Sequence, residues 1–121
     1  MGDSLSNLLL VAAILKRHQR TAEAWAAMYK PLACQLAAVR VADRHAMTTT
    51  CMETRVERPA ALQDAIDAAV ATVDGGRAFV RPSGTEDVVR VYAEATSTAA
   101  CEALSSSVVA LVRAHAGGSV P

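Results

Sequence analysis

The chain has 121 residues and a mass of 12.6 kDa, enough for one compact core and too little for two ordinary domains. Its 12 basic and 12 acidic side chains balance, so no overall field attracts nucleic acid or an anionic membrane, and any anion site must be local. Hydrophobic residues make up 52% of the chain and aromatic residues only 3%. This alanine-rich composition favours helices over a β-sandwich.

Cysteine and histidine spacing argues against a disulfide framework or a metal site. The three cysteines are odd in number and form no C-x-x-C pair, and the three histidines are equally scattered. We therefore assign no metal ligand and expect reduced thiols in a cytoplasmic protein. The apolar run at 8–15 is shorter than the roughly 20 residues that span a bilayer, and it lacks the flanks of a signal peptide. No membrane association is expected.

Two helices are predicted at the N-terminus. Asp3 or Ser4 can cap the first, in which apolar residues recur at helical spacing and also occupy much of the opposite side. A helix that is apolar nearly all round either lies deep in a core or awaits a second surface. We therefore interpret residues 1–30 as a helical segment leading in from a preceding domain. The second helix is expected over 21–29, capped by Thr21 and stopped before Pro31.

One strand and a poorly patterned segment come next. The stretch CQLAAVRVAD, residues 34–43, is typical of a strand with Leu36 and Val39 or Val41 on its buried side. The stretch MTTTCMETRVE, residues 47–57, has the threonines of a strand without regular alternation. We expect a loop there that could contain a short strand.

Two amphipathic helices flank a pair of β-rich runs. Pro59 suits the first turn of one helix, and Ser97 or Thr98 can cap the other. Their apolar positions are Leu62, Ile66, Val70 and Val73, then Cys101, Leu104, Val108, Leu111 and Val112. Cys101 is therefore expected in the core. The element order predicts an α+β domain over 31–116, a small and mostly antiparallel sheet covered by helices, followed by a disordered tail at 117–121.

The two β-rich runs lie in RAFVRPSGTEDVVRVYAEA, residues 77–95, on either side of PSGTED. If Arg81 and Val88 close the ladder, strand alternation places five side chains on one face of the sheet. These side chains are Phe79, Arg81, Val88, Arg90 and Tyr92. Both guanidinium groups would then flank the loop.

Such a loop has the groups that bind a phosphate dianion. Ser83 and Thr85 supply hydroxyl donors, Gly84 frees backbone N–H groups, and the two arginines supply planar cationic forks. An ordinary hairpin loop with solvated polar residues would carry the same short motif, and the pattern alone leaves both interpretations open. Two acidic residues follow at 86 and 87, and we expect them to pair with arginines or to cap loop N–H groups.

The segment FVRPSGTE followed by VRVYAE resembles the phosphate-binding loop of the α-D-phosphohexomutase superfamily. Many members have proline after RPSGTE, whereas Asp87 at this position is similar to the phosphoacetylglucosamine mutase branch. The segments GDSLSNLLLVAAIL, VADRHAMTTT and LQDAIDAAV also resemble that branch. The resemblance covers nearly the whole chain but only the last of the family's four domains, which implies the TBP-like fold of that C-terminal domain.

The resemblance implies an isomerase that interconverts N-acetylglucosamine 6-phosphate and N-acetylglucosamine 1-phosphate, on the way to UDP-N-acetylglucosamine. That family uses a phosphoserine, a Mg²⁺ ion and a sugar bisphosphate intermediate that reorients between half-reactions. Its last domain grips the phosphate that is not being transferred. By position, this role falls to Arg81, Ser83, Gly84, Thr85 and Arg90.

The serine, metal and sugar-specificity loops of the family are absent from this chain, so we assign no catalytic or metal residue to it. We expect the chain to be inactive alone, with the sugar phosphate and the preceding domains of the intact enzyme as its partners. A stand-alone module that binds phosphate or sugar phosphate is the alternative. A nucleic-acid binder is a weaker third, because the chain has neither a basic stripe nor an aromatic platform.

Overall fold

The computed structural model describes residues 3–117, which fall into two compact units, one ending at Pro31 and the other beginning at Leu32. The first unit contains helices α1 (Ser4–Arg17) and α2 (Ala22–Ala26). The Asp3 carboxylate caps α1 and the Thr21 hydroxyl caps α2, each by accepting backbone N–H groups of the first turn. Both predicted helices are confirmed, although α2 ends earlier than the expected residue 29.

Helix α1 buries none of its side chains. Four leucines are each more than 60% exposed: Leu5, Leu8, Leu9 and Leu10. An isolated helix of this length is marginal in water, because most helical stability in proteins comes from packing of an apolar face. That the segment leads in from a preceding domain stays a prediction. Among residues 3–117, no helix combines the length and apolar character needed to cross a bilayer.

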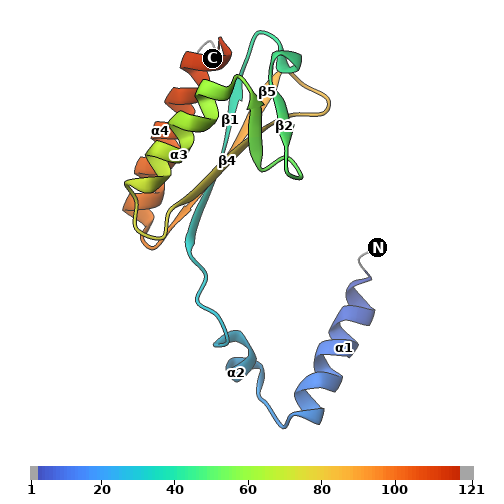
Figure 1. Ribbon diagram of the computed structural model, residues 1–121. Helices are drawn as coiled ribbons and strands as arrows, with labels where there is room; N and C mark the ends of the chain where they lie inside the picture. The colour runs from blue at the N-terminus through green and yellow to red at the C-terminus, as the bar shows by residue number, and fades with distance from the viewer. Residues whose placement is uncertain (1–2, 118–121) are drawn as a thin grey trace. The chain divides into compact units, whose positions relative to one another are not determined.

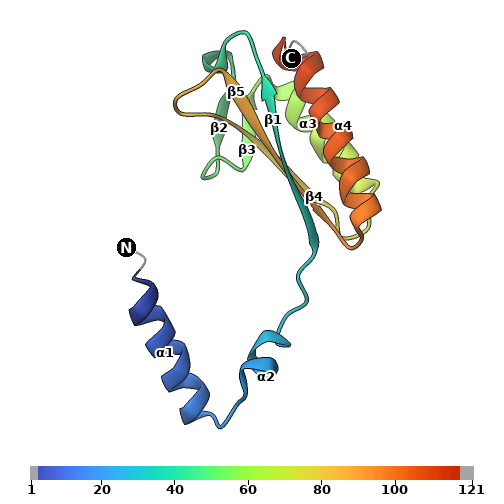
Figure 2. The same cartoon turned by 180° about the vertical axis from the view of Figure 1, so that it is seen from behind.

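The second unit is an antiparallel sheet with the strand order β1-β5-β4, joined by the separate hairpin β2–β3. Helices α3 and α4 run side by side along one face of the sheet (Figure 1 and Figure 2). The elements are β1 (Ala33–Arg40), a 3₁₀ turn η1 (Arg44–Ala46), β2 (Thr48–Thr50), β3 (Arg55–Arg58), α3 (Ala60–Ala71), β4 (Arg77–Pro82), β5 (Val88–Ala95) and α4 (Thr98–Ala116). The predicted α+β class is confirmed.

The core lies between this sheet and the two helices. Alternate residues of β5 are completely buried, from Val89 to Ala95, and they belong to one core cluster with Leu62 and Ile66 of α3 and Leu104 of α4. Cys101 also lies in the core, as predicted. Its thiol donates to the carbonyl of Ala93, and burial raises its pKa. The opposite face of the sheet carries Arg81 and Arg90 of the β4–β5 hairpin, both of which are exposed.

Strand β1 corrects one prediction about the core. Val39 and Val41 are buried, but Leu36 is 77% exposed and pairs with Tyr92 across the ladder. Positions separated by an odd number of residues point to opposite faces of a strand, so Leu36 cannot share the buried face with either valine. The exposed leucine therefore belongs to the same face as the hairpin arginines.

Residues 47–57 form strands β2 and β3 joined by a tight turn, where a loop with at most one short strand was expected. A register shift between Thr48 and Thr49 interrupts the pairing. Such a bulge breaks the period-two pattern of side chains, which explains why alternation is not visible in the sequence. At the other end of the chain, Gly117 caps α4 in a left-handed conformation, and the rest of the predicted tail lies outside the described residues.

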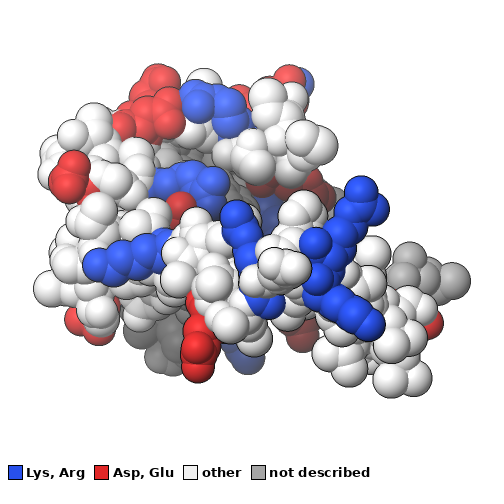
Figure 3. All heavy atoms as spheres, turned by 90° about the horizontal axis from the view of Figure 1, so that it is seen from below, with Lys and Arg blue, Asp and Glu red and all other residues white. Residues whose placement is uncertain are grey.

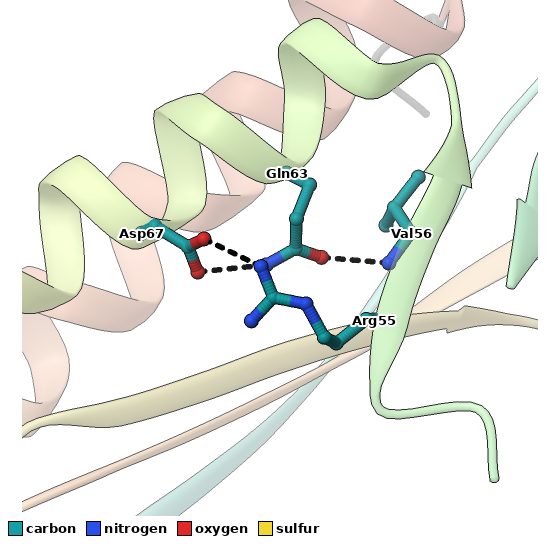
Figure 4. Close-up of polar contacts among 4 residues, drawn as sticks. All are labelled: Arg55, Val56, Gln63 and Asp67. Atoms are coloured by element: carbon teal, nitrogen blue, oxygen red, sulfur yellow. Dashed lines mark hydrogen bonds and ion pairs between the residues drawn. The ribbon is translucent and has the colours of Figure 1, made fainter. Parts of the chain in front are cut away.

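A buried glutamine fastens β3 to α3 (Figure 4). The N–H of Val56 donates to Gln63 Oε1 at 2.6 Å, and Gln63 Nε2 donates to the carboxylate of Asp67 at 2.8 Å. Arg55 donates to the other oxygen of Asp67 at 2.7 Å. The hydrogen bonds from Arg55 and then Gln63 lower the pKa of Asp67. The β2–β3 hairpin, which carries the turn at 51–54, is thus anchored to the helical layer.

Candidate phosphate-binding site

The loop between β4 and β5 lies beside the β2–β3 hairpin (Figure 1). The last ladder pair is Pro82 with Val89, and Arg81 lies opposite Arg90. The Ser83 N–H then donates to the carbonyl of Val88 at 2.8 Å. The predicted closure by Arg81 and Val88 is therefore wrong by two residues. Because side chains alternate with a period of two, the shift leaves both arginines on the predicted face.

A cavity of about 490 Å³ opens at this loop. Its lining residues are Glu53, Arg81, Pro82, Ser83, Gly84, Thr85 and Arg90. All five residues expected from the sequence to hold a phosphate group thus meet at one cavity. Two of them come from strands and three from the loop, so the sheet ladder holds the guanidinium groups next to the loop.

The loop residues differ in exposure. Ser83 is only 7% exposed, whereas Gly84 and Thr85 are exposed. A Cβ atom built on Gly84 would meet no protein atom within 4 Å, so the space beside this residue is open. An anion could therefore approach the backbone closely at Gly84, with hydroxyl and guanidinium donors on either side.

Glu53 is the residue of this cavity that the sequence did not reveal. Its carboxylate accepts from Arg81 NH1 at 2.9 Å, and both side chains are about half exposed (58% and 50%). The two residues are 28 positions apart: Arg81 lies in the three-stranded sheet, and Glu53 lies in the turn that joins the two strands of the other sheet. Only the β2–β3 hairpin, which did not show in the alternation pattern, brings them together.

The two acidic residues of this loop, Glu86 and Asp87, face elsewhere. The Asp87 carboxylate accepts from the N–H of Arg44 at 3.4 Å, and the Asp87 carbonyl accepts from the N–H of Val41 at 3.0 Å. Glu86 and Asp87 line a separate cavity with residues of β1 and β5. The prediction that Asp87 caps a loop N–H or pairs with an arginine side chain is wrong, because its carboxylate accepts from a backbone N–H of η1. Neither carboxylate lines the cavity that contains the two arginines.

An apolar cavity of about 360 Å³ adjoins the anion cavity and shares Glu53, Arg81 and Arg90 with it. Phe79 and Tyr92 stack there with ring centroids 4.9 Å apart. Its other lining residues include Leu36 and Met52. The two arginines therefore lie at the border between a polar and an apolar hollow.

A polar cluster stiffens this face of the sheet. The Tyr92 hydroxyl donates to the Glu94 carboxylate, which also pairs with Arg77 at 2.9 Å. These contacts, the tyrosine bond first, lower the pKa of Glu94, and the same bond raises the pKa of Tyr92. The Arg77 guanidinium lies 5.9 Å from the centre of the Tyr92 ring. The strand segments beyond Arg81 and Arg90 are thus cross-linked by side chains.

A metal ion does not fit the residues that the structure describes, since among them no group of three or more His, Cys, Asp or Glu side chains is placed to hold one. Apart from Glu53, which pairs with Arg81, the polar groups of the candidate site are hydrogen-bond donors and arginines. This composition suits an oxyanion and not a cation.

Comparison with known proteins places residues 36–111 in the family model described as phosphoglucomutase/phosphomannomutase, C-terminal domain. Over 119 residues, the chain is 46% identical to the phosphoacetylglucosamine mutase of Arabidopsis thaliana, covering 98% of this chain and 21% of that protein. The chain therefore spans about a fifth of the length of the relatives it matches.

Solved structures agree with this similarity. The crystal structure of Aspergillus fumigatus N-acetylphosphoglucosamine mutase in complex with GlcNAc-6P and magnesium matches with a TM-score of 0.87 and 41% identity, covering 95% of this chain and 22% of that one. A second structure of that mutase, in complex with glucose 1,6-bisphosphate, matches with a TM-score of 0.83 and 41% identity over 98% of this chain and 22% of that one.

Proposed function

Because the chain belongs to the family of phosphoglucomutase and phosphomannomutase C-terminal domains, we propose that it is the substrate-phosphate-binding domain of a phosphoacetylglucosamine mutase. The enzyme would interconvert N-acetylglucosamine 6-phosphate and N-acetylglucosamine 1-phosphate in the cytoplasm, for UDP-N-acetylglucosamine synthesis. Residues 31–116 would form the binding domain, and residues 1–30 would lead in from a preceding domain. The relatives that match nearly the whole of this chain are each named as a phosphoacetylglucosamine mutase.

The observation that carries the proposal is the convergence of five predicted ligand residues on one cavity. Arg81 and Arg90 offer planar guanidinium forks, Ser83 and Thr85 offer hydroxyls, and Gly84 leaves room for close approach of an anion. A small dianion needs such a local site. Figure 3 shows one face of the molecule on which basic and acidic side chains both lie among uncharged ones, in keeping with the zero net charge.

The domain would contribute positioning to the reaction. Phosphoryl transfer depends on in-line geometry and charge neutralisation, and a domain that grips the phosphate group not being transferred fixes the rest of the sugar. The same grip would serve both orientations of a sugar bisphosphate. Magnesium, which is bound in the Aspergillus fumigatus structure, would supply charge neutralisation at the transferred group from a site outside this chain.

A binding module without mutase activity is a second candidate, because all the lining residues of the anion cavity lie between positions 53 and 90 of this one chain. Weak binding of phosphate by the chain alone is expected under both proposals, so the two are distinguished by catalysis.

A titration tests the shared part of both proposals. In ¹⁵N-labelled chain, inorganic phosphate and N-acetylglucosamine 6-phosphate should shift the backbone amides of Ser83, Gly84 and Thr85 first. N-acetylglucosamine without a phosphate group should leave these signals in place. Saturating phosphate that moves other amides and not these three would refute the site.

A domain exchange tests the mutase. The chain would replace the matching C-terminal segment of the Arabidopsis thaliana relative, and turnover of N-acetylglucosamine 6-phosphate would be followed with Mg²⁺ and a sugar bisphosphate. We expect measurable activity that Arg81→Ala in the exchanged segment strongly reduces. An exchanged protein that folds, yet is as inactive as the relative lacking its last domain, would favour the binding module.

A further inference from the structure

Glu53 places a negative charge at the cavity where we propose that a phosphate dianion binds. It is the acidic residue among those that line the anion cavity, and it also lines the adjoining apolar cavity. Its carboxylate accepts from Arg81 NH1 at 2.9 Å. A ligand that needs Arg81 therefore meets a group that already uses one of its donors.

The turn that carries Glu53 has an uncommon backbone. Cys51, Met52 and Glu53 have φ values of 51°, 55° and 63°, in the left-handed region that residues other than glycine rarely adopt. The hydroxyl of Thr54 closes the turn by donating to the carbonyl of Cys51 at 2.7 Å. Such conformations persist only where the surrounding structure holds them, and they are frequent at functional sites. In this turn, the residue that lines the anion cavity is Glu53.

The anchor of the hairpin gives the turn a fixed base. Directly after the turn, Arg55 pairs with Asp67 and Val56 donates to the buried Gln63, both on α3 (Figure 4). The Glu53 carboxylate is thus brought to the anion cavity from a hairpin held by the helical layer. The β4–β5 loop and the turn reach the cavity from two different sheets.

The ion pair itself is weak enough to exchange. Both side chains are about half exposed, and exposed pairs of this kind contribute little, because water screens the attraction. A phosphate dianion carries two charges and several acceptor oxygens, so it competes well for a guanidinium group. A carboxylate left next to the bound dianion would repel it.

We propose that Glu53 is an internal competitor at the anion cavity: its carboxylate holds Arg81 while the cavity is free and is displaced when a phosphate group binds. The proposal rests on the proposed phosphate-binding function. Competition lowers affinity and lets the ligand leave readily. This property suits a site that must release a bisphosphorylated sugar so that it can turn between two half-reactions.

A supporting role for Glu53 predicts the opposite result. If the carboxylate served to orient the Arg81 guanidinium toward phosphate, removing its charge would weaken binding. The sign of the change in affinity therefore separates competition from support. Glu57→Gln is a matched control, because Glu57 is an exposed carboxylate on the same hairpin that lines neither cavity.

The experiment measures binding of inorganic phosphate to the 121-residue chain by NMR titration, for the unaltered chain, Glu53→Gln, Glu57→Gln and Arg81→Ala. We expect Glu53→Gln to bind about 3- to 10-fold more tightly and Glu57→Gln to be unchanged. In the unaltered chain, phosphate should also shift the Glu53 carboxylate carbon and the Arg81 Nε signal together, as the pair separates.

Each result decides between the proposals. Equal or weaker binding by Glu53→Gln, with binding clearly weakened in Arg81→Ala, would overturn the competitor role of Glu53 and leave the phosphate site intact. Absence of binding in both the unaltered chain and Glu53→Gln would overturn both. If Glu53→Gln misfolds, Glu53→Ala and the response of the Glu53 carboxylate in the unaltered chain give the same decision.

Discussion

Arg81 on β4 and Arg90 on β5 are directly opposed in the sheet ladder, and both line one cavity. Like charges placed opposite each other in a sheet repel and destabilise it. Glu53 pairs with Arg81, and the shared loop presents hydroxyl and N–H donors but no carboxylate to the cavity. The arrangement is therefore best suited to a bound anion that lies between the two guanidinium groups.

Replacing either arginine should weaken phosphate binding without unfolding the domain. We expect Arg81→Ala and Arg90→Ala each to reduce the affinity of the chain for phosphate about 10-fold, since each loses charge-assisted hydrogen bonds in a partly exposed site. Arg81→Lys should recover part of the loss, because an ammonium group keeps the charge but lacks the planar fork. Titration calorimetry measures the effect. Arg40→Ala, an exposed arginine of β1 outside the cavity, is the control.

Replacing Gly84 should weaken phosphate binding with little effect on stability. Because a Cβ atom at this position meets no protein atom within 4 Å, Gly84→Ala should change stability by less than about 0.5 kcal/mol. The added methyl group should nevertheless obstruct close approach of the anion and lower phosphate affinity about 5-fold or more. Thermal unfolding and the phosphate titration measure the two effects. Unchanged affinity would show that the anion does not approach the backbone at Gly84.

Replacing Gly75 should instead lower stability and leave phosphate affinity unchanged. Its φ of +61° is left-handed, and an added Cβ atom would lie 2.7 Å from Thr96 Cγ2. We expect Gly75→Ala to destabilise the domain by about 1–3 kcal/mol, because strain and crowding add. Urea unfolding measures this loss. Phosphate affinity of the folded fraction should be unchanged, since Gly75 does not line the anion cavity.

Replacing Gln63, a buried polar residue, should destabilise the fold. Gln63→Ala leaves the buried N–H of Val56 without its acceptor and deprives Asp67 of one donor, so we expect a loss of about 1–3 kcal/mol. Chemical unfolding of the variant measures it. Gln35→Ala, which replaces an exposed glutamine of β1, is the matched control and should change little. Equal stability of the two variants would mean that the link between β3 and α3 does not stabilise the fold.

Glu94 should make stability depend on pH in the acid range. Its pKa is lowered in the folded chain, first by the hydrogen bond from Tyr92 and also by Arg77, so its contribution is present above its unfolded pKa and is lost as the pH falls through the folded value. Glu94→Gln should therefore cost about 1 kcal/mol at neutral pH. The difference from the unaltered chain should shrink steadily below a pH of about 4.3. A difference that stays constant down to pH 2 would contradict this origin.

Much of the fold and of the candidate site could be predicted because it depends on neighbours in the chain. The Asp3, Thr21 and Ser97 caps act within one helical turn, and the spacing of apolar residues marks the faces of α3 and α4. The loop residues Ser83, Gly84 and Thr85 lie close together because they are consecutive in the chain. Strand alternation also places both arginines on one face, and this result survives an error of two residues in the ladder.

By itself, then, the sequence determined the helices, their caps, the faces of the hairpin and the residues of the anion loop, because each depends on interactions over a few positions. Tertiary structure alone decided three other features. The bulge at Thr48 and Thr49 interrupts the alternation of the second hairpin, the packing of α4 decides which face of β1 is buried and leaves Leu36 exposed, and Glu53 reaches Arg81 across 28 positions. No periodicity encodes such contacts, because they arise only when separate sheets pack against the same helical layer.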